Sequence, residues 1–274
     1  MVSQCNIADQ EGNWLEVIAL DERMLKIANE NPNFAKVNQI DIAWCYGNLA
    51  HAYYECGSSL KTGEYLLLKA EMVKQIKPID LSTRIFLTRV ISKAYKQLAE
   101  YYDGANKLTE AVTAWTEAVK ANLTLIEFNR PNNNFNSMFY IDSTRCKAGY
   151  VGSMSPIADE EEIRCCLRGI GGTLFSLLKS DPEEAARLYQ NAFPIAEKIV
   201  TRSFKFTEGF SMMLGYDFFR SLGKNGIERS KEKYTELMKF LNYYGEHSKF
   251  CADMGRDIEA KFGLLFQRTD YDEQ

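Results

Sequence analysis

Apolar residues recur at intervals of three and four positions along most of the chain, which is the spacing of amphipathic α-helices. The first clear stripe starts at Trp14, includes Val17 and Met24, and ends before Asn31-Pro32. Clusters of proline, glycine and serine separate it from later stripes. The pattern predicts helices over residues 14–27, 37–56, 65–76, 80–102, 108–128, 157–178, 182–200, 210–222, 227–244 and 250–266. No segment alternates with period two, so the predicted fold class is all-α, an antiparallel helical bundle of about nine or ten helices.

Two segments fall outside the helical pattern. Residues near 129–156 are rich in asparagine, glycine and serine, which predicts a long irregular loop. A loop of this length inside a compact domain is either functional or mobile. Residues 267–274 are polar and predict a C-terminal tail. We expect a single all-helical domain over residues 1–266.

Composition and charge narrow the class of partner. The 274 residues carry 33 Lys and Arg against 37 Asp and Glu, a net charge of −4, so duplex nucleic acid is not expected as a partner. No basic region followed by an apolar run opens the chain, and no stretch approaches the roughly 18 apolar residues of a membrane span. We therefore expect a cytoplasmic protein without a membrane partner.

The residue types that build metal and catalytic sites are sparse. Seven scattered cysteines and two histidines give no zinc spacing, so the cysteines are interpreted mainly as buried apolar residues, and no cofactor or metal is expected. Gly169, Gly171 and Gly172 lie in a helical pattern without the Lys-Ser/Thr of a P-loop, which favours close helix packing over phosphate binding. No nucleophile–base pair stands out, so we expect no catalytic residues and no enzyme.

Two blocks of the sequence resemble 14-3-3 proteins. The Tyr-Lys-Gln-Leu-Ala-Glu segment at 95–100 is similar to the family's Tyr-Arg-Tyr-Leu-Ala-Glu. Residues 162–196 resemble its seventh and eighth helices. In that block the matching residues are Ile163, Arg164, Leu167, Pro182, Ala185, Leu188, Ala192, Phe193 and Ala196. Because both blocks occur in the family's order, the resemblance implies a divergent 14-3-3-like fold, with the right-handed stacking of tetratricopeptide-related helices.

The resemblance implies a function as well as a fold. Members of this family bind phosphoserine or phosphothreonine segments of client proteins in a concave groove. Arg89, Lys93 and Lys96 are spaced by four and three, so they share one face of the predicted helix over 80–102 and are the candidate phosphopeptide-binding residues. Lys96 stands where the family has its phosphate-binding arginine, and Arg89 where it has a groove lysine. The resemblance also implies a homodimer through the N-terminal helices.

Departures from the family pattern leave alternatives open. The family's phosphate-binding tyrosine is replaced here by Gln97, so a pocket rebuilt from Lys61, Lys69 or Arg84 is one possibility, and a solvated cationic face is another. Small residues at helix contacts also resemble tetratricopeptide pairs, although their spacing is irregular. A tetratricopeptide-type scaffold that binds unphosphorylated segments, with Asn48 and Lys93 at positions resembling its carboxylate clamp, is therefore the first alternative. An all-helical enzyme or ligand sensor with a closed cavity is the second.

Overall fold

The computed structural model describes residues 2–78, 81–128, 156–200 and 206–268, and over these ranges it contains helices and no strand. The all-α prediction is confirmed for this part of the chain. The α-helices are α1 (Val2–Gln10), α2 (Trp14–Glu30), α3 (Pro32–Val37), α4 (Gln39–Glu55), α5 (Ser59–Gln75), α6 (Leu81–Gly104), α7 (Leu108–Phe128), α8 (Pro156–Ser180), α9 (Pro182–Val200), α10 (Thr207–Asn225), α11 (Lys231–Gly245) and α12 (Lys249–Arg268). None of these described helices is both long enough and apolar enough to span a bilayer.

Most helix positions follow the predicted pattern, and the differences are local. α7 and α9 have the predicted bounds, whereas α1 and α3 are short helices that the periodicity does not reveal. α3 forms because the side chain of Asn31 accepts a hydrogen bond from the Phe34 backbone N–H at 3.1 Å and Pro32 occupies the first turn. The predicted loop near 129–156 lies almost entirely outside the described residues, as does the tail beyond Arg268.

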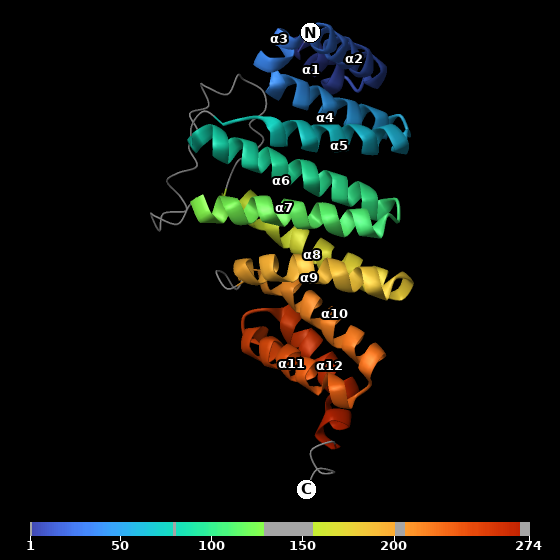
Figure 1. Cartoon of the computed structure of the whole chain (residues 1–274), viewed down its shortest axis with the longest axis vertical. Helices are drawn as coiled ribbons and strands as arrows, with labels where there is room; N and C mark the ends of the chain where they lie inside the picture. The colour runs from blue at the N-terminus through green and yellow to red at the C-terminus, as the bar shows by residue number, and fades with distance from the viewer. Residues whose placement is uncertain (1, 79–80, 129–155, 201–205, 269–274) are drawn as a thin grey trace. The chain divides into compact units, whose positions relative to one another are not determined.

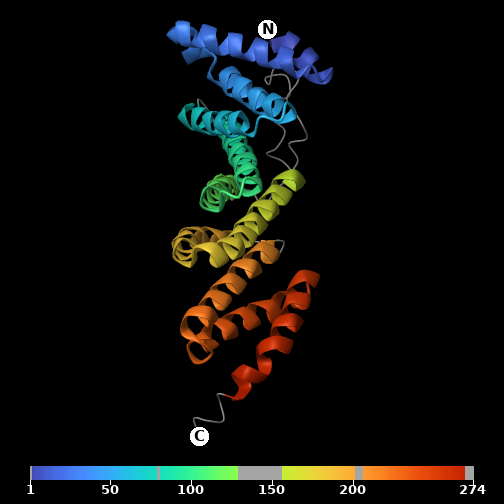
Figure 2. The same ribbon diagram turned by 90° about the vertical axis from the view of Figure 1, so that its right-hand side faces the viewer.

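The chain divides into two compact units, Met1–Asn106 and Lys107–Gln274, where the sequence predicted one domain over 1–266. In the first unit, neighbouring helices pack in chain order: α2 on α4, α4 on α5, and α5 on α6. Figures 1 and 2 both show α4, α5 and α6 side by side. Leu49, Ala70 and Leu98 are buried along these contacts. Unit 1 is therefore built from successive helical hairpins.

The second unit contains the glycine cluster of α8, and its packing confirms the structural interpretation of that cluster. A Cβ atom on Gly169 would lie 2.4 Å from the Trp115 ring of α7. A Cβ atom on Gly171 would lie 2.6 Å from the Cβ atom of Met212 on α10. Only glycine allows these helices to approach so closely without displacement. The cluster serves helix packing and forms no loop.

Candidate functional site

The structure gives the three predicted phosphopeptide-binding residues on α6 different environments. Arg89 is buried, with 3% of its surface exposed, whereas Lys93 is exposed. Lys96 is half-buried, and its Nζ lies 2.9 Å from Glu100 Oε1 in an ion pair one turn along the helix. The three cations therefore do not form one set of solvent-facing donors. Lys93 is the member of the trio that is exposed.

A lysine from a different helix lies beside Lys93. Lys69 of α5 is 6% exposed, and its Nζ donates a hydrogen bond to Gln97 Oε1 on α6 over 3.1 Å. The same Nζ lies 5.6 Å from the centroid of the Trp44 ring on α4. The charge of Lys93 acts on the Lys69 ammonium strongly enough to lower its pKa. Lys69, Lys93 and Gln97, which we call the lysine site, thus come together from α5 and α6.

Helical periodicity explains why these residues meet. Each of the three helices carries one stripe with spacings of three and four residues, and we call the surface that these neighbouring stripes form the trough. The stripes are Ile40, Trp44 and Gly47 on α4, Lys69 and Val73 on α5 with Ile76 directly after its end, and Phe86, Val90, Lys93 and Gln97 on α6. Since α4 and α6 both pack against α5, their stripes flank the stripe of α5. The trough has a polar end at the lysine site and an apolar end nearer the start of α6.

Glycine at position 47 makes room for the buried lysine. A Cβ atom there would lie 3.1 Å from Lys69 Nζ and 3.3 Å from its Cδ and Cε atoms. These distances are shorter than ordinary van der Waals contacts, so any larger side chain would displace the lysine. The aliphatic stem of Lys69 consequently lies against the backbone of α4, and its ammonium reaches the α6 side of the trough.

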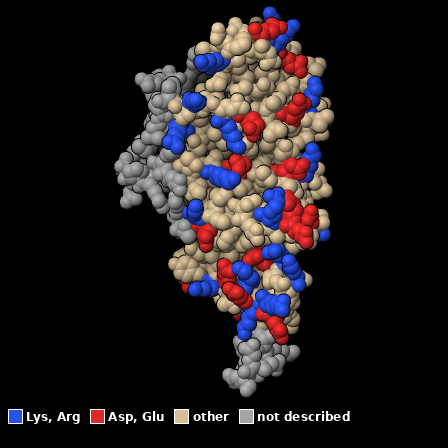
Figure 3. Space-filling model, viewed as in Figure 1, with Lys and Arg blue, Asp and Glu red and all other residues tan. Residues whose placement is uncertain are grey.

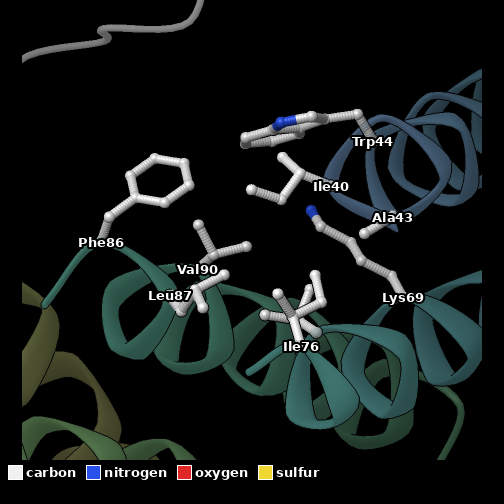
Figure 4. A pocket seen from close by; sticks show the side chains of 9 residues that line it. Ile40, Ala43, Trp44, Lys69, Ile76, Phe86, Leu87 and Val90 are labelled. Carbon is white, nitrogen blue, oxygen red and sulfur yellow. The ribbon is translucent and has the colours of Figure 1, made fainter. Parts of the chain in front are cut away.

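The apolar end of the trough is a small pocket that also reaches Lys69. Its lining consists of Ile40, Ala43, Trp44, Lys69, Val73, Ile76, Phe86, Leu87 and Val90. Figure 4 shows the rings of Trp44 and Phe86 reaching toward one another from α4 and α6, with the Lys69 ammonium pointing toward Ile40. Lys69 is thus the one charged residue of this lining.

The electrostatic environment of Lys69 disfavours its positive charge. Burial lowers the pKa of Lys69 from 10.5 to about 8, and the charge of Lys93 adds to this lowering. No carboxylate of the described residues forms an ion pair with Lys69, whose hydrogen bond goes to a neutral amide. An anion placed between the two ammonium groups would compensate both the burial and the repulsion. In Figure 3, by contrast, cationic and anionic side chains are interspersed over the visible face.

The other residues considered from the sequence have different partners. Lys61 Nζ donates to Tyr53 Oη over 2.8 Å. Asn48, the candidate clamp residue of the tetratricopeptide alternative, donates through Nδ2 to Cys5 Sγ over 3.6 Å. The Cys5 thiol in turn donates to Asp21 Oδ2 over 3.2 Å, and burial raises the pKa of Cys5 to about 12. Asn48 therefore belongs to a buried polar cluster and not to the lysine site.

This buried cluster does not resemble a metal centre. Within the part of the chain that the structure describes, no three His, Cys, Asp or Glu residues are placed to hold a metal ion. Five described cysteines are buried or half-buried, and Cys56 is exposed.

Sequence reasoning named Lys69 as an alternative cation but did not place it beside Lys93. The signal that could have found it is a lysine in the apolar stripe of a helix, because Val73 and Ile76 continue the same stripe. A charged side chain at such a buried position usually forms an ion pair within the protein or binds a ligand of opposite charge.

Comparison with known proteins adds no assignment. No protein-family model matches the chain, and no curated protein matches it. Its function is therefore inferred from the geometry of its own residues.

Proposed function

We propose that this chain is a 14-3-3-like, non-catalytic adaptor that binds client segments containing phosphoserine or phosphothreonine, with the lysine site as its phosphate site. One observation carries the proposal: Lys69 is buried between α5 and α6, its ammonium donates to the neutral amide of Gln97, and it forms no ion pair with a described carboxylate, while the charge of Lys93 further lowers its pKa. Two like charges held together in this way are unfavourable without a ligand. An anion bound between the two ammonium groups would relieve their repulsion, and this relief would contribute to its binding free energy.

The chemistry of the lysine site favours a phosphate over a carboxylate. A phosphoserine side chain carries nearly two negative charges at neutral pH and three acceptor oxygens, so it matches two ammonium groups. Gln97 is exposed and its Oε1 accepts the hydrogen bond from Lys69, so its Nε2 group remains as a further donor in this region. A carboxylate would neutralise only one of the two lysines.

The proposal keeps Lys93 from the predicted trio and changes the roles of the other two. Lys96 already has Glu100 as a counterion, so binding a phosphate there would require that pair to separate. Arg89 is too buried to reach a ligand at the surface of α6. The phosphate site is accordingly centred between α5 and α6.

The direct test measures binding of a fluorescent phosphoserine peptide library and its unphosphorylated twin by fluorescence polarisation. We expect the phosphorylated library to bind at least about tenfold more tightly, because charge-assisted hydrogen bonds contribute about 1.5–3 kcal/mol each. Lys93→Met should weaken binding about tenfold, and Lys96→Met should weaken it less. Lys26→Met is the control, since its side chain is 76% exposed on α2 and pairs with Glu30. Equal binding of the two libraries, or no binding of either, would refute the proposal.

The apolar end of the trough supports a second candidate. A tetratricopeptide-type scaffold binds unphosphorylated peptide segments between helical hairpins, and the pocket of Trp44 and Phe86 offers an apolar contact for one. Its singly charged carboxylate would then pair with one lysine of the lysine site. Loss of binding when the peptide C-terminus is amidated, with no effect of phosphorylation, would favour this candidate.

The homodimer and the cytoplasmic location also belong to the proposal. Ile7 and Leu15 in the first two helices are 55% and 75% exposed, which supports an apolar contact between N-terminal regions. Sedimentation equilibrium of the full chain tests this point. A dimer that dissociates on Leu15→Glu would support it, and a monomer at all concentrations would exclude it.

A further inference from the structure

The nitrogen of Lys69 is open to small molecules, although most of the side chain is buried. Lys69 borders a space among apolar side chains that has room for about one water-sized molecule. On the other side of the nitrogen, Gly47 is half-buried and has no side chain to cover the Nζ atom, and the hydrogen-bond partner Gln97 is exposed. The amine is therefore accessible to a molecule of a few atoms and shielded from larger ones.

The Lys69 amine is uncharged in a substantial fraction of the molecules near neutral pH. Burial and the charge of Lys93 lower its pKa from 10.5 to about 8. At pH 8 about half of the Lys69 amines are therefore uncharged, against about 0.3% of a lysine whose pKa is not shifted. The uncharged form has a free lone pair, so it is the form that reacts with electrophiles. One of its N–H groups can keep the hydrogen bond to Gln97 Oε1, which directs the lone pair away from that oxygen.

The neighbours of Lys69 on α6 favour a negative charge on its nitrogen. The charge of Lys93 already acts on Lys69, because it contributes to the lowered pKa. Lys93 and Gln97 are four residues apart, so they share one face of α6 with Cβ atoms about 5–6 Å from each other. Lys93 is exposed, and its long flexible side chain can turn toward an anion beside Gln97. An anionic group on Lys69 would therefore replace the repulsion between the two lysines by attraction.

We propose that Lys69 is a modification site for carbon dioxide, which its amine binds covalently as a carbamate. The nitrogen lone pair forms an N–C bond, one C=O π bond of carbon dioxide opens onto its oxygen, and the nitrogen loses one proton to water. The product, R–NH–COO⁻, carries one negative charge, and its formation requires no oxidant or reductant. Carbon dioxide is narrow, uncharged and apolar, so it enters a small apolar space at a lower desolvation cost than a charged acyl donor.

The test looks for the carbamate on the full chain without any peptide. The protein is equilibrated with carbon-13 bicarbonate at about pH 8, and carbon-13 NMR distinguishes a carbamate from free bicarbonate. A trialkyloxonium reagent then converts the carbamate into a stable ester, and peptide mapping by mass spectrometry locates it and separates it from the N-terminal amine. We expect at least about tenfold more label on Lys69 than on Lys26, whose side chain is 76% exposed. No carbamate resonance and no trapped ester at Lys69 would overturn the proposal.

Variants show whether the neighbouring groups act as described. Lys69→Met should remove one carbamate resonance, and persistence of every resonance would place the adduct on other amines and overturn the proposal. Lys93→Met should lower the carbamate on Lys69 at least about threefold, because the product anion loses its counterion. Lys26→Met is the matched control and should leave the carbamate unchanged. Circular dichroism checks the fold of each variant, and an unchanged amount of carbamate in folded Lys93→Met would count against the proposal.

The carbamate also has a consequence for phosphopeptide binding, and this consequence alone rests on the proposed function. The modification replaces a cation of the lysine site by an anion, so phosphopeptide affinity should fall as carbon dioxide increases at constant pH and ionic strength. Carbamate on Lys69 without an effect on phosphopeptide binding would refute the phosphate site and retain the modification. Phosphopeptide binding without carbamate on Lys69 would retain the function and overturn the modification.

Discussion

Replacing Lys69 by methionine should stabilise the protein near neutral pH, although the same change removes a ligand-binding group. The folded chain holds this ammonium in a desolvated position beside Lys93, where the pKa of Lys69 falls from 10.5 to about 8. Methionine has a similar length and no charge, so Lys69→Met keeps the stem contacts against Gly47 and removes the buried charge. A residue retained at a cost in stability is expected at a binding site.

The size and the sign of the effect follow from linkage between protonation and folding. Between pH 8 and pH 10.5 the unfolded chain keeps the Lys69 proton while the folded chain loses it, so stability of the unsubstituted protein rises with pH in this window. At about 1.4 kcal/mol per pH unit, the interval corresponds to about 3 kcal/mol. Below pH 8 Lys69 is charged in both states, so the folded protein is destabilised by the full free-energy cost of the buried charge. The advantage of Lys69→Met should therefore be about 3 kcal/mol larger at pH 7 than above pH 10.5.

The assay is urea denaturation of both proteins at several pH values, followed by tryptophan fluorescence and by circular dichroism. Trp14 and Trp44 report on unit 1, and comparing the two proteins at each pH cancels the titration of groups that they share. Lys26→Met is the control, because it removes the same charge from a side chain that is 76% exposed. A stability difference for Lys69→Met that is constant from pH 7 to pH 10 would refute the reasoning.

Three further predictions test other parts of the structure. Phosphopeptide affinity, measured by titration with a fluorescent peptide, should be highest between about pH 6 and about pH 8. Below this window the phosphate is no longer a dianion. Above the pKa of Lys69 the affinity should fall about tenfold per pH unit, because Lys69 loses its charge. Gly169→Ala should lower the free energy of unfolding by about 1–3 kcal/mol, because the new Cβ atom would clash with the α7 tryptophan. Gly223→Ala in α10 should raise it by about 0.5–1 kcal/mol, because no atom lies within 4 Å of the new Cβ atom. The opposite order of stabilities in urea denaturation would contradict the packing. Among the six described cysteines, Cys56 should be alkylated first by iodoacetamide in the native protein and Cys5 should resist, as peptide mapping by mass spectrometry would show; early labelling of Cys5 would contradict its burial and raised pKa.

The long amphipathic helices were predictable because their apolar stripes begin and end next to capping or turn-forming residues in the sequence. α9 begins at Pro182 after Asp181, whose side chain accepts a hydrogen bond from the Glu184 backbone N–H at 3.0 Å, so the cap was visible in the sequence. α1 was not predicted, because its buried apolar residues are the small Cys5 and Ala8, which give little periodic signal. Short helices of this kind form through contacts with their neighbours.

The candidate site was predictable only in part, because contacts between different helices do not follow from the spacing within one helix. Spacing along α6 identified Lys93, because residues on one helix face follow from sequence alone. The same spacing grouped Lys96 with it, but the i,i+4 pair with Glu100 gives that lysine another partner. The approach of Lys69 depends on the packing of α5 against α4 and α6 and on the space that Gly47 leaves, neither of which a single stripe specifies.

The pKa of Lys69, measured by NMR on the full chain with isotope-labelled lysine side chains and assigned with Lys69→Met, tests the phosphate site most directly. The account predicts a value near 8 in the unliganded protein, rising when a phosphoserine peptide is added because the phosphate compensates the charge of Lys93. The unphosphorylated peptide should leave the pKa of Lys69 near its unliganded value. A pKa near 10.5 in the free protein, or a value that does not respond to the phosphopeptide, would contradict the account.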